Sequence, residues 1–183
     1  MVVEPYWINE VLSFWFDELD EADWFSGDPR ADAETRLRFL ALHLQLVATD
    51  AAGIQEPRAL LAAVIVLDQF SRNLFRGDPR AYASDPIARR LAKQAIDAGV
   101  DQALPPRQRL FLYLPFEHSE QAGHQAMAMA LISSLDNAGW TRYAQLHKDL
   151  IDKFGRFPGR NVALGRQSTP AEVAALQGPN ARF

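Results

Sequence analysis

Apolar residues recur every three to four positions along most of the chain, which is the spacing of amphipathic helices. Prolines and glycines mark the points where these helices begin and end. The pattern predicts helices over residues 5–16, 29–53, 57–73, 85–99, 106–135 and 140–154, and a short helix that begins at Pro170. No two alternating apolar runs are joined by a hairpin turn, so we expect no sheet.

Three helices carry apolar residues in informative patterns. In the first, helical spacing is shown by Leu37, Leu40, Ala41, Leu44 and Val47, and in the second, one face is formed by Tyr143, Leu146, Leu150 and Phe154. The run Ala59–Leu67 is apolar on all sides and predicts a central buried helix. Pro115 is expected to interrupt the helix over 106–135, and Gly139 to separate that helix from the next.

A near-repeat bears on how the helices are organised. Residues 25–31 and 75–81 are almost identical, so either two helix starts use the same capping chemistry or a helix pair is duplicated. Prolines at helix starts and glycines at helix ends favour stacked antiparallel helix pairs. The sequence therefore predicts an all-α protein in which residues 1–183 form a single domain of stacked helix pairs.

Composition removes several classes of function. The chain has no cysteine, which excludes disulfides, thiolate metal sites and a cysteine nucleophile. A net charge of −4 and a pI of about 5.5 argue against nucleic-acid binding. The longest apolar run has nine residues, and no basic segment precedes an apolar stretch at the N-terminus, so we expect a cytoplasmic protein with no membrane partner. Acids dominate residues 1–34 and bases residues 153–183, an asymmetry that permits a homodimer.

The first polar cluster follows the buried apolar run. It consists of Asp68, Gln69, Arg72, Asn73 and Arg76, which fall within one arc of a helix that turns about 100° per residue. One interpretation is an ion pair between Asp68 and Arg72, four residues apart. The functional interpretation is an arginine-lined pocket, in which Arg72 and Arg76 hold an anion.

The second polar cluster contains two histidines. Glu117, Glu120, Gln121 and His124 are expected to share a helix face, with His118 off its centre. A carboxylate beside His118 would raise its pKa and suit it to acid–base chemistry, with Glu120 close by. A histidine that is hydrogen-bonded for structural reasons is the alternative. The sequence gives little support for a metal site at Glu120 and His124, because a single pair of residues four positions apart is not a complete set of metal ligands. We therefore expect no metal and no cofactor.

The third polar cluster is a loop in which arginines alternate with glycines. Arg156, Arg160 and Arg166 lie there beside Asn161. Glycines allow backbone N–H groups to converge and arginine forks bind anions, so the loop predicts a phosphate or carboxylate clamp. The alternative is ion pairing with Asp68, Glu117 or Glu120. His147 could face this loop or be a packed core histidine.

Blocks of sequence along nearly the whole chain resemble the bacterial family catalogued as domain of unknown function 924. The blocks are Phe14–Phe16, Leu67–Gly77, Leu114–Glu120, Tyr143–His147 and Phe154–Pro170. The resemblance implies an all-helical fold similar to tetratricopeptide-repeat folds, and no established activity. The family usually has histidine where this chain has Gly159 and an acid where it has His124.

The leading functional hypothesis is binding of an anionic small molecule, or of a peptide carboxylate or phosphate, on a concave surface. Its ligand-binding residues would be Asp68, Arg72, Asn73, Arg76, Arg156, Arg160 and Asn161. The second hypothesis is a hydrolase or transferase, with His118 or His147 as general base, Glu120 nearby, and arginines as anion stabilisers. The third is a protein-binding helical repeat without catalysis.

Overall fold

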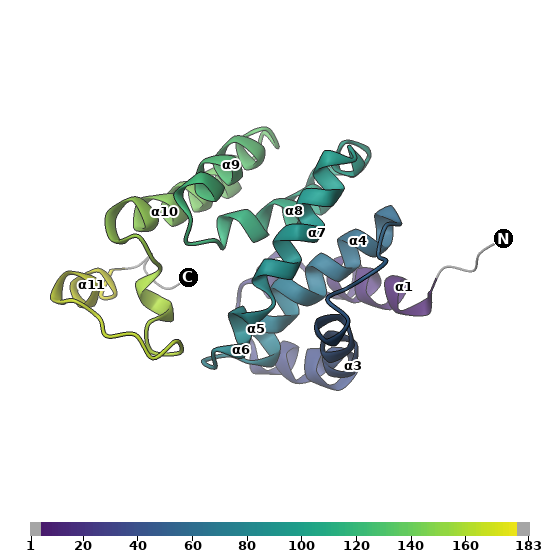
Figure 1. Cartoon of the computed structure of the whole chain (residues 1–183), viewed down its shortest axis with the longest axis horizontal. Helices are drawn as coiled ribbons and strands as arrows, with labels where there is room; N and C mark the ends of the chain where they lie inside the picture. Colours follow the sequence, from purple (N-terminus) through teal and green to yellow (C-terminus); the bar gives the residue numbers. More distant parts are fainter. Residues whose placement is uncertain (1–4, 179–183) are drawn as a thin grey trace. The chain divides into compact units, whose positions relative to one another are not determined.

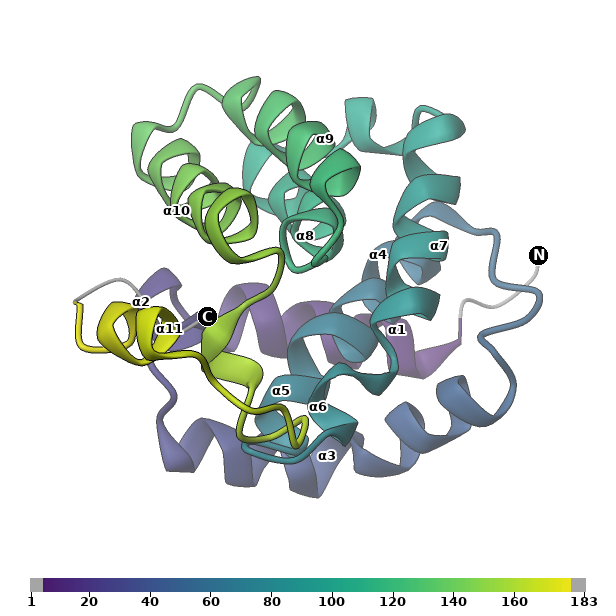
Figure 2. The same cartoon turned by 60° about the vertical axis from the view of Figure 1, so that its left-hand side comes forward.

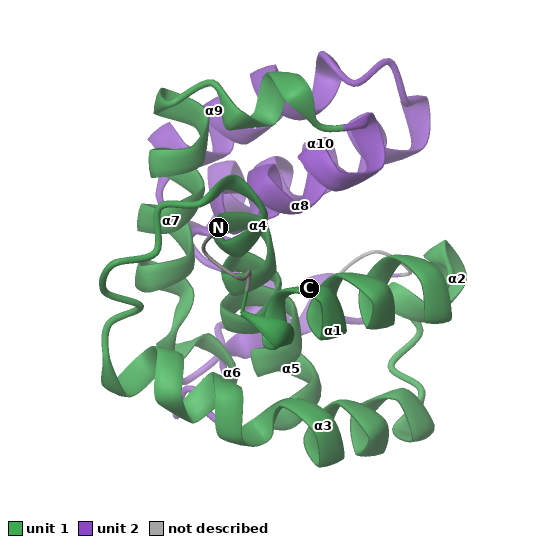
Figure 3. Cartoon of the chain, turned by 90° about the vertical axis from the view of Figure 1, so that its right-hand side faces the viewer, with its two compact units in different colours: residues 1–76, 80–104 green, residues 77–79, 105–183 purple. Residues whose placement is uncertain are grey.

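A computed structural model describes residues 5–178, which divide into two compact units (Figures 1 and 3). Unit 1 comprises residues 1–76 and 80–104, and unit 2 comprises residues 77–79 and 105–183. The described residues contain helices and turns but no strand, which confirms the all-α class. The repeat arrangement and the single domain stay predictions.

Within the described residues, unit 1 holds the first seven α-helices. They are α1 (Tyr6–Ser13), α2 (Glu21–Trp24), α3 (Pro29–Ala48), α4 (Pro57–Ile65), α5 (Ser71–Leu74), α6 (Arg80–Ala83) and α7 (Asp85–Asp97). Two π-helical turns, η1 (Phe14–Glu18) and η2 (Val66–Phe70), continue α1 and α4, and a 3-10 turn, η3 (Val100–Ala103), follows α7. Each π-helical turn is one wider loop of backbone inserted into an otherwise regular helix.

Unit 2 holds the remaining helices. They are α8 (Pro106–Glu117), α9 (Ala122–Ser133), α10 (Ala138–Phe154), the 3-10 turn η4 (Pro158–Arg160) and α11 (Pro170–Ala175). The helix α9 packs against both α8 and α10 (Figure 2). Thr169 begins α11 with a capping box, at the helix start that the sequence predicts, and Gly155 ends α10 in the left-handed conformation with φ of 68°.

The core of unit 1 forms around α4 and η2. Every residue of Ala59–Leu67 is buried, which confirms the central buried helix. The next turn places the Phe70 ring 4.8 Å from that of Phe39 and 5.4 Å from that of Trp15, measured between ring centroids. Aromatic packing thus fixes the end of the helix on which the first polar cluster lies.

The helix predicted from the apolar spacing is present as α3, but its buried face is not formed by all of those apolar residues. Leu37 and Leu44 are 81% and 53% exposed, whereas Thr35, Phe39, His43 and Leu46 are buried. Apolar residues lie on more than one side of this helix, so periodicity alone does not select a face. The buried face is the one whose aromatic ring contacts Phe70 and whose histidine finds hydroxyl partners.

Two helix boundaries in unit 2 also differ from the prediction. Pro115 lies inside α8, and the break comes after Glu117, between the end of α8 and the start of α9. A proline in the last turn costs only local hydrogen bonding, so it does not end the helix at once. Gly139 lies in the first turn of α10, because Asn137 caps that helix by accepting from the backbone N–H of Trp140.

The predicted apolar face of α10 is displaced as well. Tyr143 is 57% exposed, while Ala144, His147 and Ile151 are the buried residues of this helix. The buried face of α10 therefore has a histidine at its centre. Phe111, Tyr113 and Phe116 of α8 are buried.

Candidate functional site

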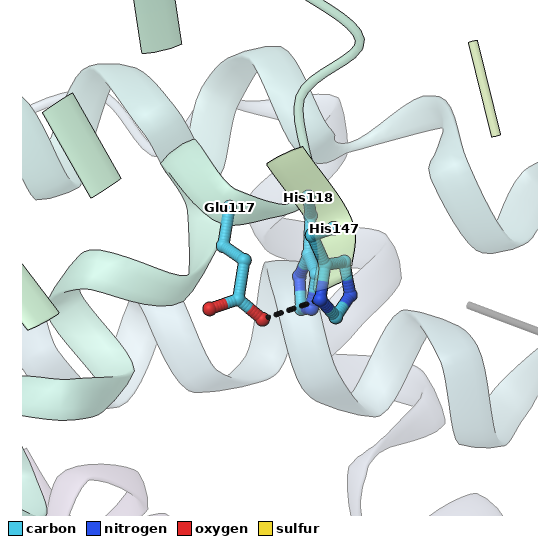
Figure 4. A group of neighbouring side chains, drawn as sticks. All are labelled: Glu117, His118 and His147. Carbon is cyan, nitrogen blue, oxygen red and sulfur yellow. Dashed lines mark ion pairs between the residues drawn. The ribbon is translucent and has the colours of Figure 1, made fainter. Parts of the chain in front are cut away.

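Glu117, His118 and His147 come together in unit 2 (Figure 4). Glu117 is the last residue of α8, His118 follows it directly, and His147 projects from the buried face of α10. The three side chains lie close enough that one ligand atom from each is within 4.8 Å of those of the other two. The residues are 3%, 9% and 5% exposed, so water is largely excluded around them.

The end of α8 is held in place by backbone contacts. The N–H of His118 still donates to the Leu114 carbonyl at 2.8 Å, so His118 keeps the helical position while the chain turns away after it. The buried Gln125 side chain donates to the carbonyls of Glu117 and Ser119 at 2.5 and 2.7 Å. These carbonyls lie at a helix end, where helical partners run out, so Gln125 fixes the backbone that carries Glu117 and His118.

The contacts of His147 determine which of its two ring nitrogens carries the hydrogen. Its Nδ1 lies 2.9 Å from the Tyr143 carbonyl oxygen and 3.1 Å from Oε1 of Glu117. A carbonyl oxygen only accepts hydrogen bonds, so Nδ1 must carry the hydrogen. In the neutral ring, Nε2 then keeps its lone pair, the arrangement found in histidines that act as bases or bind metals.

Arg160 closes one side of this cluster. Its guanidinium carbon lies 4.4 Å from the centroid of the Phe157 ring, and its Nη1 donates to the His118 carbonyl at 2.9 Å. The Phe157 ring in turn meets the His147 ring edge-on at 5.5 Å. Arg160 is 4% exposed, so a positive charge is buried beside the two histidines.

Glu120, predicted as a catalytic residue, holds the arginine loop to the end of α8. It accepts from Arg166 at 2.7 and 2.9 Å and from the Phe157 N–H at 2.8 Å. Burial alone would raise the pKa of Glu120, but the hydrogen bonds from Arg166 and from the Phe157 backbone outweigh it and hold that pKa below its usual value. The alternative of internal ion pairing in this loop is therefore realised at Glu120.

The other residues of the loop have structural partners too. Arg156 donates to both oxygens of Glu172 at 2.6 and 2.9 Å. The hydrogen bond from Arg156, with a further one from the Thr169 N–H, lowers the pKa of Glu172 to about 2. Asn161 is fully buried and donates to the Ser168 hydroxyl at 3.0 Å. These contacts tie the loop to the start of α11.

The first polar cluster lies in unit 1 and is also paired. Arg72 contacts Asp68 at 3.3 Å and donates to both oxygens of Asp85 at 3.0 and 3.1 Å. Arg76 and Asn73 both donate to Asp32 of α3. The expected pair of Asp68 and Arg72 is present, and the partners Asp85 and Asp32 come from segments that the sequence does not link to this cluster.

The structure thus assembles part of the predicted site. His118 and His147 meet beside Arg160, with Glu120 holding the adjoining loop, all in unit 2. Asp68, Arg72, Asn73 and Arg76 form their own paired group in unit 1. A shared concave surface for all three clusters stays a prediction, as do the ligand-binding roles of these residues.

Glu117 is a member of the candidate site that the sequence analysis considers only as a neighbour of His118. Its position directly before a histidine at a helix end is the only local signal. His124, by contrast, contacts the Ser119 hydroxyl at 2.8 Å. Among the described residues, the side chains grouped closely enough to share a metal ion include Glu117 and not the pair of Glu120 and His124.

These features define an all-α protein with a buried carboxylate–histidine cluster at the junction of two helices. Residues 11–180 match the family described as bacterial protein of unknown function, DUF924, and the chain belongs to that family. A solved structure of a protein of unknown function, ATU0120 from Agrobacterium tumefaciens, is 36% identical, with a TM-score of 0.88. The match covers 93% of this chain and 97% of that one.

The comparison with curated proteins found no match. Within residues 5–178, no helix combines the length and the apolar character that crossing a membrane requires.

Proposed function

We propose that the protein is an enzyme that carries out acid–base chemistry on a small anionic substrate at Glu117, His118 and His147. The observation that carries this proposal is the contact of 3.1 Å between the Glu117 carboxylate and Nδ1 of His147, both buried. A carboxylate that accepts a hydrogen bond from Nδ1–H fixes the tautomer in which Nε2 is the basic nitrogen of the ring, which is the arrangement of histidine bases in hydrolases.

The proposed chemistry is a transfer of an acyl or phosphoryl group. Nε2 of His147 takes a proton from water or from a substrate hydroxyl, and the oxygen so activated attacks the substrate. The imidazolium that forms is stabilised by the Glu117 carboxylate, and it returns the proton to the leaving group. His118, whose ring centroid lies 6.0 Å from that of His147, is the second donor of the site.

The buried positive charge of Arg160 is the reason for proposing an anionic substrate. Its buried positive charge is next to both histidines, where an anion would be attracted in a low-dielectric surrounding. The guanidinium groups of Arg72, Arg76, Arg156 and Arg166 each have a carboxylate within hydrogen-bonding distance. We assign anion recognition to Arg160 and His118 because they lie beside His147, and a structural role to the four arginines that pair with carboxylates.

Hydrolysis of p-nitrophenyl acetate and p-nitrophenyl phosphate tests the proposal. The wild-type protein should hydrolyse one of them, and His147→Asn or Glu117→Gln should lower kcat about 100-fold or more. Lys148→Ala is the matched control, because Lys148 is the next residue on α10 and forms an ion pair with Asp152 on the outer side. A wild-type rate equal to that of buffer, or equal rates for all the variants, would contradict the proposal.

The exposed face of α3 favours a second candidate function, which is self-association into a homodimer. Leu37, Leu44 and Val47 are 81%, 53% and 38% exposed on this one helix, and exposed apolar side chains that cluster favour a protein partner. Light scattering coupled to size-exclusion chromatography tests this candidate. The wild-type protein should elute as a dimer and Leu37→Glu, Leu44→Glu as a monomer, whereas a wild-type monomer would exclude it.

A further inference from the structure

We propose that the groove between α9 and α10 in unit 2 binds a short apolar peptide whose amino and carboxyl ends are both free. The groove has a volume of about 640 Å³ and is open to solvent. The two helices that form it pack side by side (Figure 2). The inference goes beyond the proposed function, because no residue that lines the groove belongs to the cluster of Glu117, His118 and His147.

One side of α10 forms a wall of the groove. It contributes residues three and four positions apart, which are Ala138, Thr141, Arg142, Gln145 and Leu146. This spacing places side chains along a single side of a helix. The buried residues of α10 lie on the opposite side, and they are Ala144, His147 and Ile151. The fold therefore uses one side of α10 for packing and leaves the other accessible to a ligand.

The groove offers apolar surface to the side chains of a peptide. Met129 of α9 and Leu146 of α10 both line it, and both are half-buried. A methionine side chain is flexible and adapts to apolar partners of different shape. Leucine side chains of a peptide that pack on these two residues remove apolar surface from water, which favours binding.

Arg142 supplies the charge that recognises a carboxylate. It is exposed, and within residues 5–178 no group forms a hydrogen bond or an ion pair with it. The arginines at positions 72, 76, 156 and 166, by contrast, each contact a carboxylate of the chain. A guanidinium group binds a carboxylate through two parallel hydrogen bonds, so Arg142 is suited to hold the carboxyl end of the peptide.

Asp136, which precedes α10, supplies the opposite charge. It lines the groove, is exposed, and has no hydrogen-bond or ion-pair partner among the described residues. The helix rises about 6 Å from Ala138 to Arg142. Two residues of an extended peptide span about 7 Å, so a dipeptide can place its ammonium group near Asp136 and its carboxylate near Arg142. A ligand with an anionic group alone would leave the charge of Asp136 without a partner.

NMR titration of the wild-type protein with leucyl-leucine tests the proposal. The amide signals of Thr141, Arg142 and Gln145 and the methyl signal of Met129 should shift, with a dissociation constant on the order of 1 mM or tighter. Met127 also lies on α9 but does not line the groove, so its methyl signal is the internal reference and should stay unchanged. No shifts, or shifts confined to residues outside the groove, would overturn the proposal. Shifts of the groove signals with protein concentration alone would show a second copy of the chain there and would also overturn it.

Derivatives of the peptide separate the two charges. N-acetyl-leucyl-leucine lacks the ammonium group and leucyl-leucine amide lacks the carboxylate. Each should bind about 10-fold more weakly than leucyl-leucine, because each loses one charge-assisted contact. Equal affinity for all three peptides would overturn the proposal, since the free ends would then not be recognised.

Protein variants assign each charge to a residue. Arg142→Gln should weaken binding of leucyl-leucine about 10-fold and leave binding of its amide unchanged, and Asp136→Asn should leave binding of the N-acetyl form unchanged. Both residues are exposed and have no partner among the described residues, so both variants should fold as the wild type does. Arg89→Gln is the matched control, because Arg89 of α7 in unit 1 likewise has no ion-pair partner among those residues. Wild-type affinity in Arg142→Gln, or an equal loss in Arg89→Gln, would overturn the proposal.

Discussion

Acidification should destabilise unit 1 through His43, a buried histidine on α3. Its Nε2 lies 2.7 Å from the Ser71 hydroxyl and 3.4 Å from that of Ser84, and both hydroxyls also donate to the Leu67 carbonyl. Burial disfavours the charged ring and lowers the pKa of His43 from 6.5 to about 4. The neutral ring is therefore part of the folded core.

The sign and the size of the effect follow from proton linkage. As pH falls below 6.5, His43 becomes protonated in the unfolded chain, whereas in the folded chain it stays neutral until the pH nears 4. The stabilisation is thus fully present above pH 6.5 and is lost as pH falls toward 4. The whole pKa difference corresponds to about 3 kcal/mol, which we reduce to about 1 to 2 kcal/mol for screening by nearby solvent.

Urea denaturation of the wild-type protein and of His43→Gln measures this contribution. Between about pH 7.5 and about pH 4.5, the wild type should lose about 1 to 2 kcal/mol more unfolding free energy than the variant does. The amide of glutamine can still donate to Ser71, and all other titrating groups are common to both proteins, so their effects cancel. The same pH dependence in both proteins would refute the reasoning.

Three further predictions concern packing and ion pairs. Phe70→Ala should lower the unfolding free energy by about 3 to 5 kcal/mol in urea denaturation, because this fully buried ring contacts three other aromatic rings. Asp85→Asn should lower the unfolding free energy by about 3 kcal/mol in the same assay, since it removes one of the two carboxylates that pair with Arg72. Carbon NMR should give Glu172 a pKa of about 2, and Arg156→Met should raise it; the pair therefore adds stability above pH 4.5 and loses it as pH falls toward 2.

The sequence predicts where helices begin more reliably than which side of them is buried. Asp28 before Pro29, and Thr169 before Pro170, act locally as caps, so their effect can be read from neighbouring residues. The buried side of α3 depends instead on Phe70, which is 31 positions from Phe39 along the chain. Apolar residues on the other side of α3 then give a misleading pattern.

For the candidate site, too, the sequence predicts the local features and misses the contacts between helices. The types of residue in each polar cluster are visible in the sequence, and so is the pairing of Asp68 with Arg72, because it lies within one helix. The contact between Glu117 and His147 joins two helices and leaves no periodic signal. His147 could be placed on α10 from sequence, but only the displaced face of that helix shows that it points to Glu117.

The π-helical turn η2 has a consequence for how this chain can vary. Such a turn contains one residue more than the regular helix needs, so deletion of a single residue within Val66–Phe70 would restore an unbroken α-helix. The wide turn takes up its extra residue locally, so the residues of α5 that follow would keep their present phase around the helix. Arg72 would still face Asp85, and Ser71 would still face His43. A homologue with one residue fewer in this segment can therefore keep the same acidic and hydroxyl partners.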